Sequence, residues 1–396
     1  MAISYAGRWR RPLLQTLGAL AALALLLLVG TADGRWLLRA GWEEGRILAR
    51  RRPIPAVAAS PATDAKTRGK LGLVLAARAF AADSLGLKAG RSFEYYTDIG
   101  RDTLLLLLSG ARRDTLAPYT WWFPVVGRVP YRGYFDPRAA KAARDGLLRG
   151  GYDAYLRPSS AFSTLGWFDD PVLNTAIVGD SVDLANTVVH ELTHNTFYAP
   201  SQAAFNESFA SFVGARGAER FFRARGDTAA VAAAERRWAD ERLLGEFWAA
   251  LGRSVDSAYR AHPGADSAAR AARLGARAAV TVAARRLLAD SVVPRLQDPR
   301  RTRGGPAALA RWAARTPLDN AALLARRTYA RELGLFDLVY EREGRDLGRS
   351  VARLIALAKS QPKDPYGAVR RWVGAITPPA ASAAVARTRA AIATGA

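Results

Sequence analysis

The chain has 396 residues, half of them hydrophobic, which is enough for two or three domains and excludes a wholly disordered chain. It contains no cysteine, so disulfides, thiolate zinc sites and iron–sulfur clusters are excluded, and any metal ion must be held by His, Asp or Glu. The formal net charge of +23 comes mostly from arginines spread along the chain, which favours a solvated basic surface over a nucleic-acid partner.

The N-terminal segment, residues 1–33, is typical of an export signal or a membrane anchor. Arg8, Arg10 and Arg11 precede an uncharged apolar run, Leu13–Gly30. This run is just long enough to span a bilayer with little tilt, and the cleavage site that could follow it is weak. We therefore expect an uncleaved anchor in preference to a cleaved signal, with the body of the protein outside the cytoplasm. The expected location is the bacterial cell envelope, either anchored in the inner membrane or periplasmic.

Helices and strands are expected to alternate in the next part of the chain. An amphipathic segment and a Pro/Ala/Ser-rich linker, or extended lead-in at 53–67, make up residues 34–67. Asp136 is a suitable N-cap for a helix with Pro137 at its first position. Five successive leucines at 104–108 favour a strand that is buried on both faces. The expected helices are 34–50, 71–85 and 137–150, and the expected strands are 92–97, 103–108 and 152–158.

From Asp183 onward the pattern is almost entirely helical. We expect an α+β fold that is predominantly α-helical, with a zincin-like catalytic core, a small mixed sheet before the central helix, and a helical C-terminal region. The expected helices are 183–198, one starting near Ser201, 228–260, 265–296, 307–316 and 318–358. The expected divisions are a core at 68–260, a helical region completing the active-site cleft at 261–375, and a weakly patterned tail at 376–396.

The strongest chemical signal is the motif HExxH at 190–194, which contains two of the three histidines in the chain. On a helix, His190 and His194 lie at positions i and i+4 on one face, so both imidazoles can reach one metal ion. Zinc takes such nitrogen ligands and keeps one position open for water in catalytic sites. Glu191 then suits the role of general base that takes the proton of that water.

A third ligand is needed, and Glu207 is the first acidic residue after the motif. Twelve residues separate His194 from Glu207, which suffices to end one helix, turn tightly at 199–201 and bring a second helix back beside the metal. The sequence therefore predicts one Zn²⁺ held by His190, His194 and Glu207. If the connection is longer, Glu219 or Asp170 could replace Glu207, whereas His262 looks like a turn residue.

The oxyanion of a hydrolysed amide also needs a hydrogen-bond donor, and tyrosines are the remaining candidates. They are Tyr131, Tyr134, Tyr198 and Tyr329. We assign Tyr329 to this catalytic role and Tyr131 to substrate binding, although tyrosines on such stretches are often packing residues. Asp169 and Asp170 lie just before the metal helix and are candidates for orienting a ligand or binding a substrate amine, and Glu94 is a further candidate for the amine.

These residues resemble a known family, the bacterial predicted aminopeptidases, which are gluzincin-like envelope proteins. The resemblance extends from about Arg35 to Trp372. It is carried by TWWFPVVGRVPYRGYFD (120–136), FSTLGWFDDPVLNT (162–175) and VVHELTHNTFYAPSQAAFNESFASFVGARGAERF (188–221). It implies an exported zinc aminopeptidase with the same three ligands and Glu191 as base. The chain departs from many members by lacking a lipoprotein cysteine, and Trp122 and Arg128 stand where a disulfide is expected.

We therefore expect a membrane-associated zinc aminopeptidase that cleaves peptide substrates lying along an edge strand such as 152–158. One alternative is a zinc endopeptidase. Another, of a different class, is a basic envelope-binding protein whose metal site is not catalytic. The sequence leaves the physiological substrate and the oligomeric state open.

Overall fold

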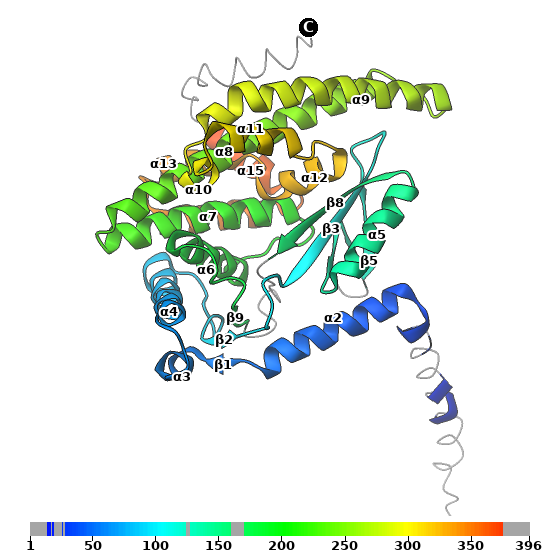
Figure 1. Ribbon diagram of the computed structural model, residues 1–396. Coiled ribbons are helices and arrows are strands. Elements are labelled where there is room, and N and C mark those ends of the chain that lie inside the picture. The colour runs from blue at the N-terminus through cyan, green and yellow to red at the C-terminus, as the bar shows by residue number, and fades with distance from the viewer. Residues whose placement is uncertain are drawn as a thin grey trace, which may run out of the picture.

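The structure is a computed structural model that describes residues 14–16, 18–19, 26, 28–123, 127–159 and 170–374 (Figure 1). Within these residues no helix has the length and apolar character needed to cross a membrane. Half of the expected anchor, Leu13–Gly30, and the whole of the tail at 376–396 lie outside the described residues. The expected predominantly helical α+β fold is confirmed.

The chain enters the described body through helix α2 (Ala32–Ala49), which lies beside the sheet (Figure 1). The Thr31 hydroxyl caps it by accepting a hydrogen bond from the Gly34 N–H at 3.0 Å. Two contacts fix α2 to strand β7 (Tyr131–Tyr134). The Trp36 indole donates to the Gly133 carbonyl at 2.6 Å, and Asp33 pairs with Arg132.

The expected linker at 53–67 is wrong, because helix α3 (Ile54–Ala59) and the start of helix α4 (Ala65–Leu85) occupy it. A proline in the first turn favours a helix start, so the proline content that indicated a linker instead begins α3. Ile54 is fully buried, which anchors this short helix in the core. Helix α4 is capped by Asp64, whose carboxylate accepts from the Thr67 N–H at 2.9 Å.

The main sheet has four strands and is antiparallel throughout. Central strand β3 (Leu105–Arg112) pairs with β8 (Tyr152–Ser159) on one side and with β7 and β4 (Pro118–Tyr119) on the other. The expected mixed pairing is confined to a separate three-stranded sheet of β1 (Arg52–Pro53), β2 (Tyr95–Thr97) and β9 (Val172–Leu173). Strands β5 (Trp121–Phe123) and β6 (Gly127–Val129) form a hairpin.

Two of the expected strands have shifted bounds. The strand expected at 92–97 is limited to Tyr95–Thr97, because Phe93 adopts a left-handed backbone with φ of 63°. The strand expected at 103–108 runs on to Arg112, since β8 pairs with it along its whole length.

The two faces of the main sheet are covered by different helices. Helix α5 (Pro137–Arg149) covers one face so closely that a Cβ on Gly110 would lie 2.9 Å from a methyl carbon of Leu147. Helix α12 (Asn320–Tyr329) lies along the other face (Figure 1). Side chains alternate between the faces of a strand, so Tyr155 and Arg157 of β8 point to the same side.

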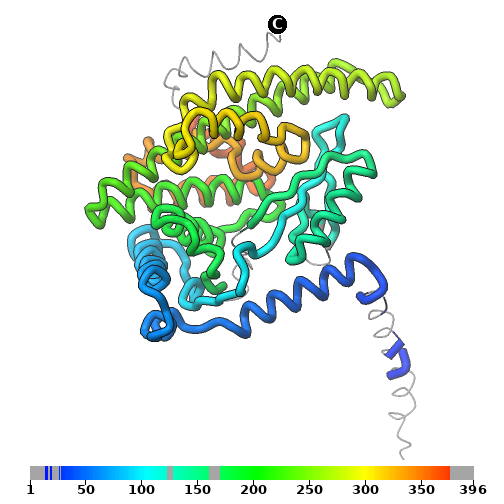
Figure 2. Tube along the Cα trace, in the orientation of Figure 1, coloured from blue at the N-terminus to red at the C-terminus, as the bar shows by residue number. Residues whose placement is uncertain are grey.

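Helices α6 (Ser181–Thr196) and α7 (Ala203–Ala224) pack against each other at the centre of the helical part (Figure 1). Phe205, Phe209 and Phe212 of α7 pack on Phe336, with ring centroids 5.8, 6.3 and 5.8 Å away. Beyond α7, helix α8 (Thr228–Arg260) is followed by α9 (Ser267–Leu287), which lies beside it (Figure 2). The segments that follow are Leu288–Val292 (π), Val293–Arg295 (3₁₀), α10 (Pro299–Thr302) and α11 (Gly305–Arg315).

The single helix expected at 318–358 is wrong, because three helices occupy this part. They are α12, α13 (Leu333–Arg342) and α14 (Leu347–Ser360), and α15 (Pro365–Gly374) follows. The first break comes where Glu332 adopts a left-handed backbone with φ of 52°. A hydrogen bond from the Arg331 N–H to the Ser208 hydroxyl at 3.0 Å holds this break against α7. Tertiary contact therefore overrides the helical propensity of the sequence here.

Candidate metal centre

Helix α6 presents the HExxH motif because both its start and its buried face are well defined. Asp180 caps it by accepting hydrogen bonds from the Val182 and Asp183 N–H groups, each at 3.0 Å. Val188 and Leu192 are fully buried and fix the rotation of the helix. The helix begins and ends two residues earlier than expected, at Ser181 and Thr196.

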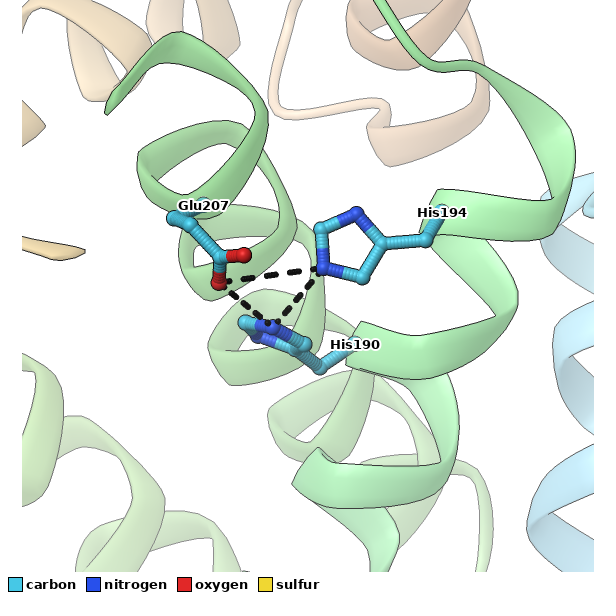
Figure 3. Close-up of side chains that lie close together, drawn as sticks. All are labelled: His190, His194 and Glu207. Carbon is cyan, nitrogen blue, oxygen red and sulfur yellow. Dashed lines mark hydrogen bonds and ion pairs between the residues drawn. The ribbon is translucent and has the colours of Figure 1, made fainter. Parts of the chain in front are cut away.

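The structure brings His190, His194 and Glu207 together, as Figure 3 shows. His190 and His194 project from α6, and Glu207 faces them from α7. The two Nε2 atoms are 3.2 Å apart. A carboxylate oxygen of Glu207 lies 3.5 Å from Nε2 of His190 and 3.8 Å from Nε2 of His194. All three side chains are largely shielded from solvent, with exposed fractions of 16%, 5% and 19%.

These separations fit a zinc ion. Ligands about 2.0–2.1 Å from a tetrahedral ion lie roughly 3.3 Å from one another. The three observed distances bracket that value without any movement of the backbone. Two neutral nitrogen donors with one carboxylate leave a fourth position open, as in catalytic zinc sites.

The electrostatics of the cluster favour one neutral imidazole and an ionised carboxylate. Burial and the neighbouring His190 lower the pKa of His194 to about 4. Burial alone would raise the pKa of Glu207, but the hydrogen bond with His190 and the charges nearby lower it. Burial by itself would lower the pKa of His190, but the nearby Glu207 and Glu191 outweigh it and raise this pKa. A cation in this place would therefore meet a deprotonated His194 and a charged Glu207.

Helices α6 and α7 approach closely because α7 carries glycine at the crossing. A Cβ on Gly214 would lie 3.0 Å from the carbonyl oxygen of Asn186 and 3.1 Å from Cβ of His190. A Cβ on Gly217 would lie 2.6 Å from a methyl carbon of Val189. Any side chain at these positions would push the helices apart. The glycines thus set the distance across which Glu207 reaches the histidines.

The connection between the two helices is short and held by Asn206. Its side chain accepts a hydrogen bond from the Ala199 N–H at 2.9 Å and donates one to the Ala199 carbonyl at 2.8 Å. Asn206 is only 1% exposed, so these bonds are shielded from water. Ser201 adopts a left-handed backbone with φ of 61°, which reverses the chain. These two hydrogen bonds between Asn206 and Ala199 also fix the position of the next residue, Glu207.

Two acids accompany Glu191, the residue between the histidines that we expect to act as base. Burial and the charges of Glu207 and Asp170, against the opposing effect of His190, raise the pKa of Glu191 to about 7. Burial and Asp170 raise the pKa of Glu44, on α2, to about 7 as well. An oxygen of Glu44 is buried and has no hydrogen-bond partner among the described residues. Asp170 itself is 9% exposed.

A group of tyrosines lies near Glu207. Tyr329 at the end of α12 is half-buried, and desolvation of its phenol together with the nearby charge of Glu207 raises its pKa to about 12. Its hydroxyl accepts a hydrogen bond from Arg157 at 2.7 Å. Burial raises the pKa of Tyr131, and the charges of Tyr329 and Glu207 act in the same direction. Burial and the charge of Glu207 also raise the pKa of Tyr198, although this side chain is 42% exposed.

The other candidates lie elsewhere or outside the described residues. Tyr134 lies on the opposite face of β7 from Tyr131 and lines a cavity of about 320 Å³ under α5. Glu94 pairs with Arg78, and Glu219 pairs with Arg216 and Arg223. His262 lies in the turn after α8. Asp169 lies outside the described residues.

Sequence reasoning missed Glu44 and Arg157. Glu44 follows Glu43 on α2, and Glu43 is the more deeply buried of the two and pairs with Arg39 and Arg101, so the sequence contains no signal for Glu44 in particular. Arg157 had no signal either, because arginine is frequent throughout this chain and a half-buried strand position cannot be recognised locally.

Comparison with known proteins places the chain in a class and then in a family. The helix pair and its three donors define a candidate metal-dependent hydrolase site. A family model described as "Putative aminopeptidase" matches residues 35–365, so the chain belongs to this family, which implies a hydrolase with peptidase activity. No curated protein and no solved structure matches the chain significantly. The zincin-like character of the core stays a prediction.

Proposed function

We propose that the protein is a zinc-dependent aminopeptidase with Glu191 as its general base. The observation that carries the proposal is the cluster of His190, His194 and Glu207, whose donor atoms all lie within 4.8 Å of one another. Glu191 follows His190 directly, and the family membership gives the substrate class. The three ligands would hold one ion, which, when bound, polarises the scissile carbonyl and makes water a stronger acid.

The residues of the chain supply the proton transfers. Glu191 accepts the proton of the attacking water and passes it to the amine that leaves. A base with a pKa raised toward neutrality, as burial does for Glu191, both accepts and releases that proton readily. Tyr329 transfers no proton and instead donates a hydrogen bond from its hydroxyl group to the oxygen on which negative charge develops.

The exopeptidase preference is assigned to the acids on the Glu191 side. A free α-ammonium group needs a buried negative charge, and Asp170 with Glu44 beside it provides one. Strand β8 has only β3 as a strand partner within the described residues, so a peptide can add to its open edge. Tyr131 lies on β7, with β3 between it and β8, so its proposed contact with the substrate is near Glu207 and not at that edge.

Export and membrane association are also part of the proposal. They rest on the arginines before the apolar run Leu13–Gly30 and not on the described helices. A reporter fused to the C-terminus should be active outside the cytoplasm, and activity only inside it would contradict this topology.

The decisive experiment combines metal analysis with a substrate panel. We expect one zinc per chain, hydrolysis of free-amine peptides, no hydrolysis of N-blocked peptides, and loss of activity on chelation. Glu191→Gln should keep zinc but lower turnover by roughly 10²–10⁴-fold, because the amide cannot accept the proton. Cleavage of N-blocked peptides would instead indicate an endopeptidase. Bound zinc without any hydrolysis would indicate an envelope-binding protein with a non-catalytic site.

A further inference from the structure

Arg157 and Tyr329 form a close pair beside the candidate metal centre. The Nη2 atom of Arg157 lies 2.7 Å from the hydroxyl oxygen of Tyr329, and the guanidinium carbon lies 4.6 Å from the centre of the ring. Arg157 belongs to β8 and Tyr329 to the last turn of α12. The pair thus links the open edge strand to the helix that ends at the site.

The backbone around Tyr329 is fixed next to a metal ligand. Ser208, the residue after Glu207, accepts a hydrogen bond from the Arg331 N–H at 3.0 Å, and its hydroxyl lies 3.5 Å from the Thr328 carbonyl. Tyr329 lies between these two residues in the chain, so its backbone is pinned against the start of α7. The charges of both Glu207 and Glu191 reach the phenol.

The direction of the hydrogen bond decides what Tyr329 can do. A guanidinium group has only donors, so the phenol oxygen must accept in this contact. The hydroxyl hydrogen of Tyr329 is therefore left to donate to something else. Burial keeps that hydrogen on the oxygen at neutral pH, because it raises the pKa of the phenol to about 12.

We propose that Arg157 is a positioning residue that holds the Tyr329 hydroxyl as a hydrogen-bond donor to the oxyanion of the peptide being cleaved. This inference rests on the proposed function, since it needs a reacting carbonyl at the metal centre. No proton is transferred in this step. Arg157 donates a hydrogen bond to the phenol oxygen, and the phenol hydroxyl donates a hydrogen bond to the developing oxyanion. The electrostatic stabilisation is available without reorganisation because the phenol is held beforehand.

The chain contains a matched pair that serves as a control. Arg326, three residues before Tyr329 on α12, donates to the Tyr155 hydroxyl at 3.3 Å, two residues before Arg157 on β8. This second pair also links β8 to α12 by an arginine–tyrosine hydrogen bond, but here the arginine lies on α12 and the tyrosine on β8. Removing it tests what the link alone contributes to the fold.

The test measures peptide hydrolysis by Arg157→Gln, Tyr329→Phe and the double variant in the full-length protein with its zinc content verified. We expect each single variant to lower kcat by tenfold or more with little change in KM, and the double variant to be no worse than Tyr329→Phe. Arg157→Lys, which keeps a donor, should recover part of the loss. Arg326→Gln, which removes the control pair from the α12 side, should retain wild-type kcat. Losses that multiply in the double variant would show that Arg157 does not act through Tyr329.

A second readout does not depend on activity. With 3-fluorotyrosine at position 329, Arg157→Gln should shift or broaden the fluorine resonance in the metal-free protein, while Arg326→Gln leaves it unchanged. An unchanged resonance in Arg157→Gln would overturn the positioning role. If Glu191→Gln proves as active as the wild type, the proposed function fails instead, and the fluorine signal still decides whether Arg157 holds the phenol.

Discussion

Replacing Gly214 with alanine tests whether close helix packing builds the metal centre. The new Cβ would lie 3.1 Å from Cβ of His190 and 3.0 Å from the Asn186 carbonyl oxygen. Carbon atoms in contact prefer about 3.5–4.0 Å, so α7 must move away from α6 by roughly 0.4 Å or more. Metal–ligand distances tolerate only about 0.2 Å. Zinc affinity should therefore fall by roughly tenfold or more.

The effect on stability needs a control for helix propensity, because alanine is favoured over glycine by about 1 kcal/mol in any helix. Gly72 on α4 provides it, since a Cβ there meets nothing within 4 Å. Overpacking costs about 1–3 kcal/mol, so Gly214→Ala should be less stable than Gly72→Ala by that amount. Urea unfolding and zinc competition with a chelator measure both effects. If Gly214→Ala is as stable as Gly72→Ala and binds zinc like the wild type, the packing argument is refuted.

Two further variants probe the connection between α6 and α7 and the start of α6. Asn206→Ala leaves the Ala199 N–H buried without its partner, while the Ala199 carbonyl still accepts from the Gln202 N–H at 3.2 Å, so urea unfolding should show a loss of roughly 1–3 kcal/mol. Burial by itself would raise the pKa of Asp180, but hydrogen bonds from Arg237 and the Asp183 N–H lower this pKa to about 2. A depressed pKa stabilises the fold above the unfolded value near 3.8 and loses that contribution as the pH falls toward 2. Asp180→Asn keeps the cap without the charge, so its stability deficit should shrink between pH 4 and pH 2, and a constant deficit would contradict the assignment.

The meeting of His190, His194 and Glu207 was predictable because the relation between these residues is local. His190 and His194 are one helical turn apart. The connection between α6 and α7 is so short that Glu207 must lie close to both histidines. The absence of cysteine and the scarcity of histidine narrowed the ligand set further. Composition and periodicity also sufficed for the predominantly helical α+β class.

The surroundings of the ligands were not predictable, because they depend on contacts between distant segments. Arg157 and Tyr329 are 172 positions apart, and no periodicity in either segment indicates their meeting. The break after Tyr329 depends on Ser208 of another helix, which explains why one long helix was expected there. Glu44 lies on α2, far in sequence from Asp170, so only the folded chain shows them as neighbours.

The row of contacts between β8 and α12 has a consequence for the order in which the protein matures during synthesis. Asp153, Tyr155 and Arg157 find their partners in Asn320, Arg326 and Tyr329, between 167 and 172 positions later. The three proposed metal donors are all synthesised once α7 has been made, but Phe205, Phe209 and Phe212 of α7 pack on Phe336, which follows α12. The donors therefore leave the ribosome well before the core that holds them in place is complete. A chain shortened before α12 should neither bind the proposed ion tightly nor act as a catalyst.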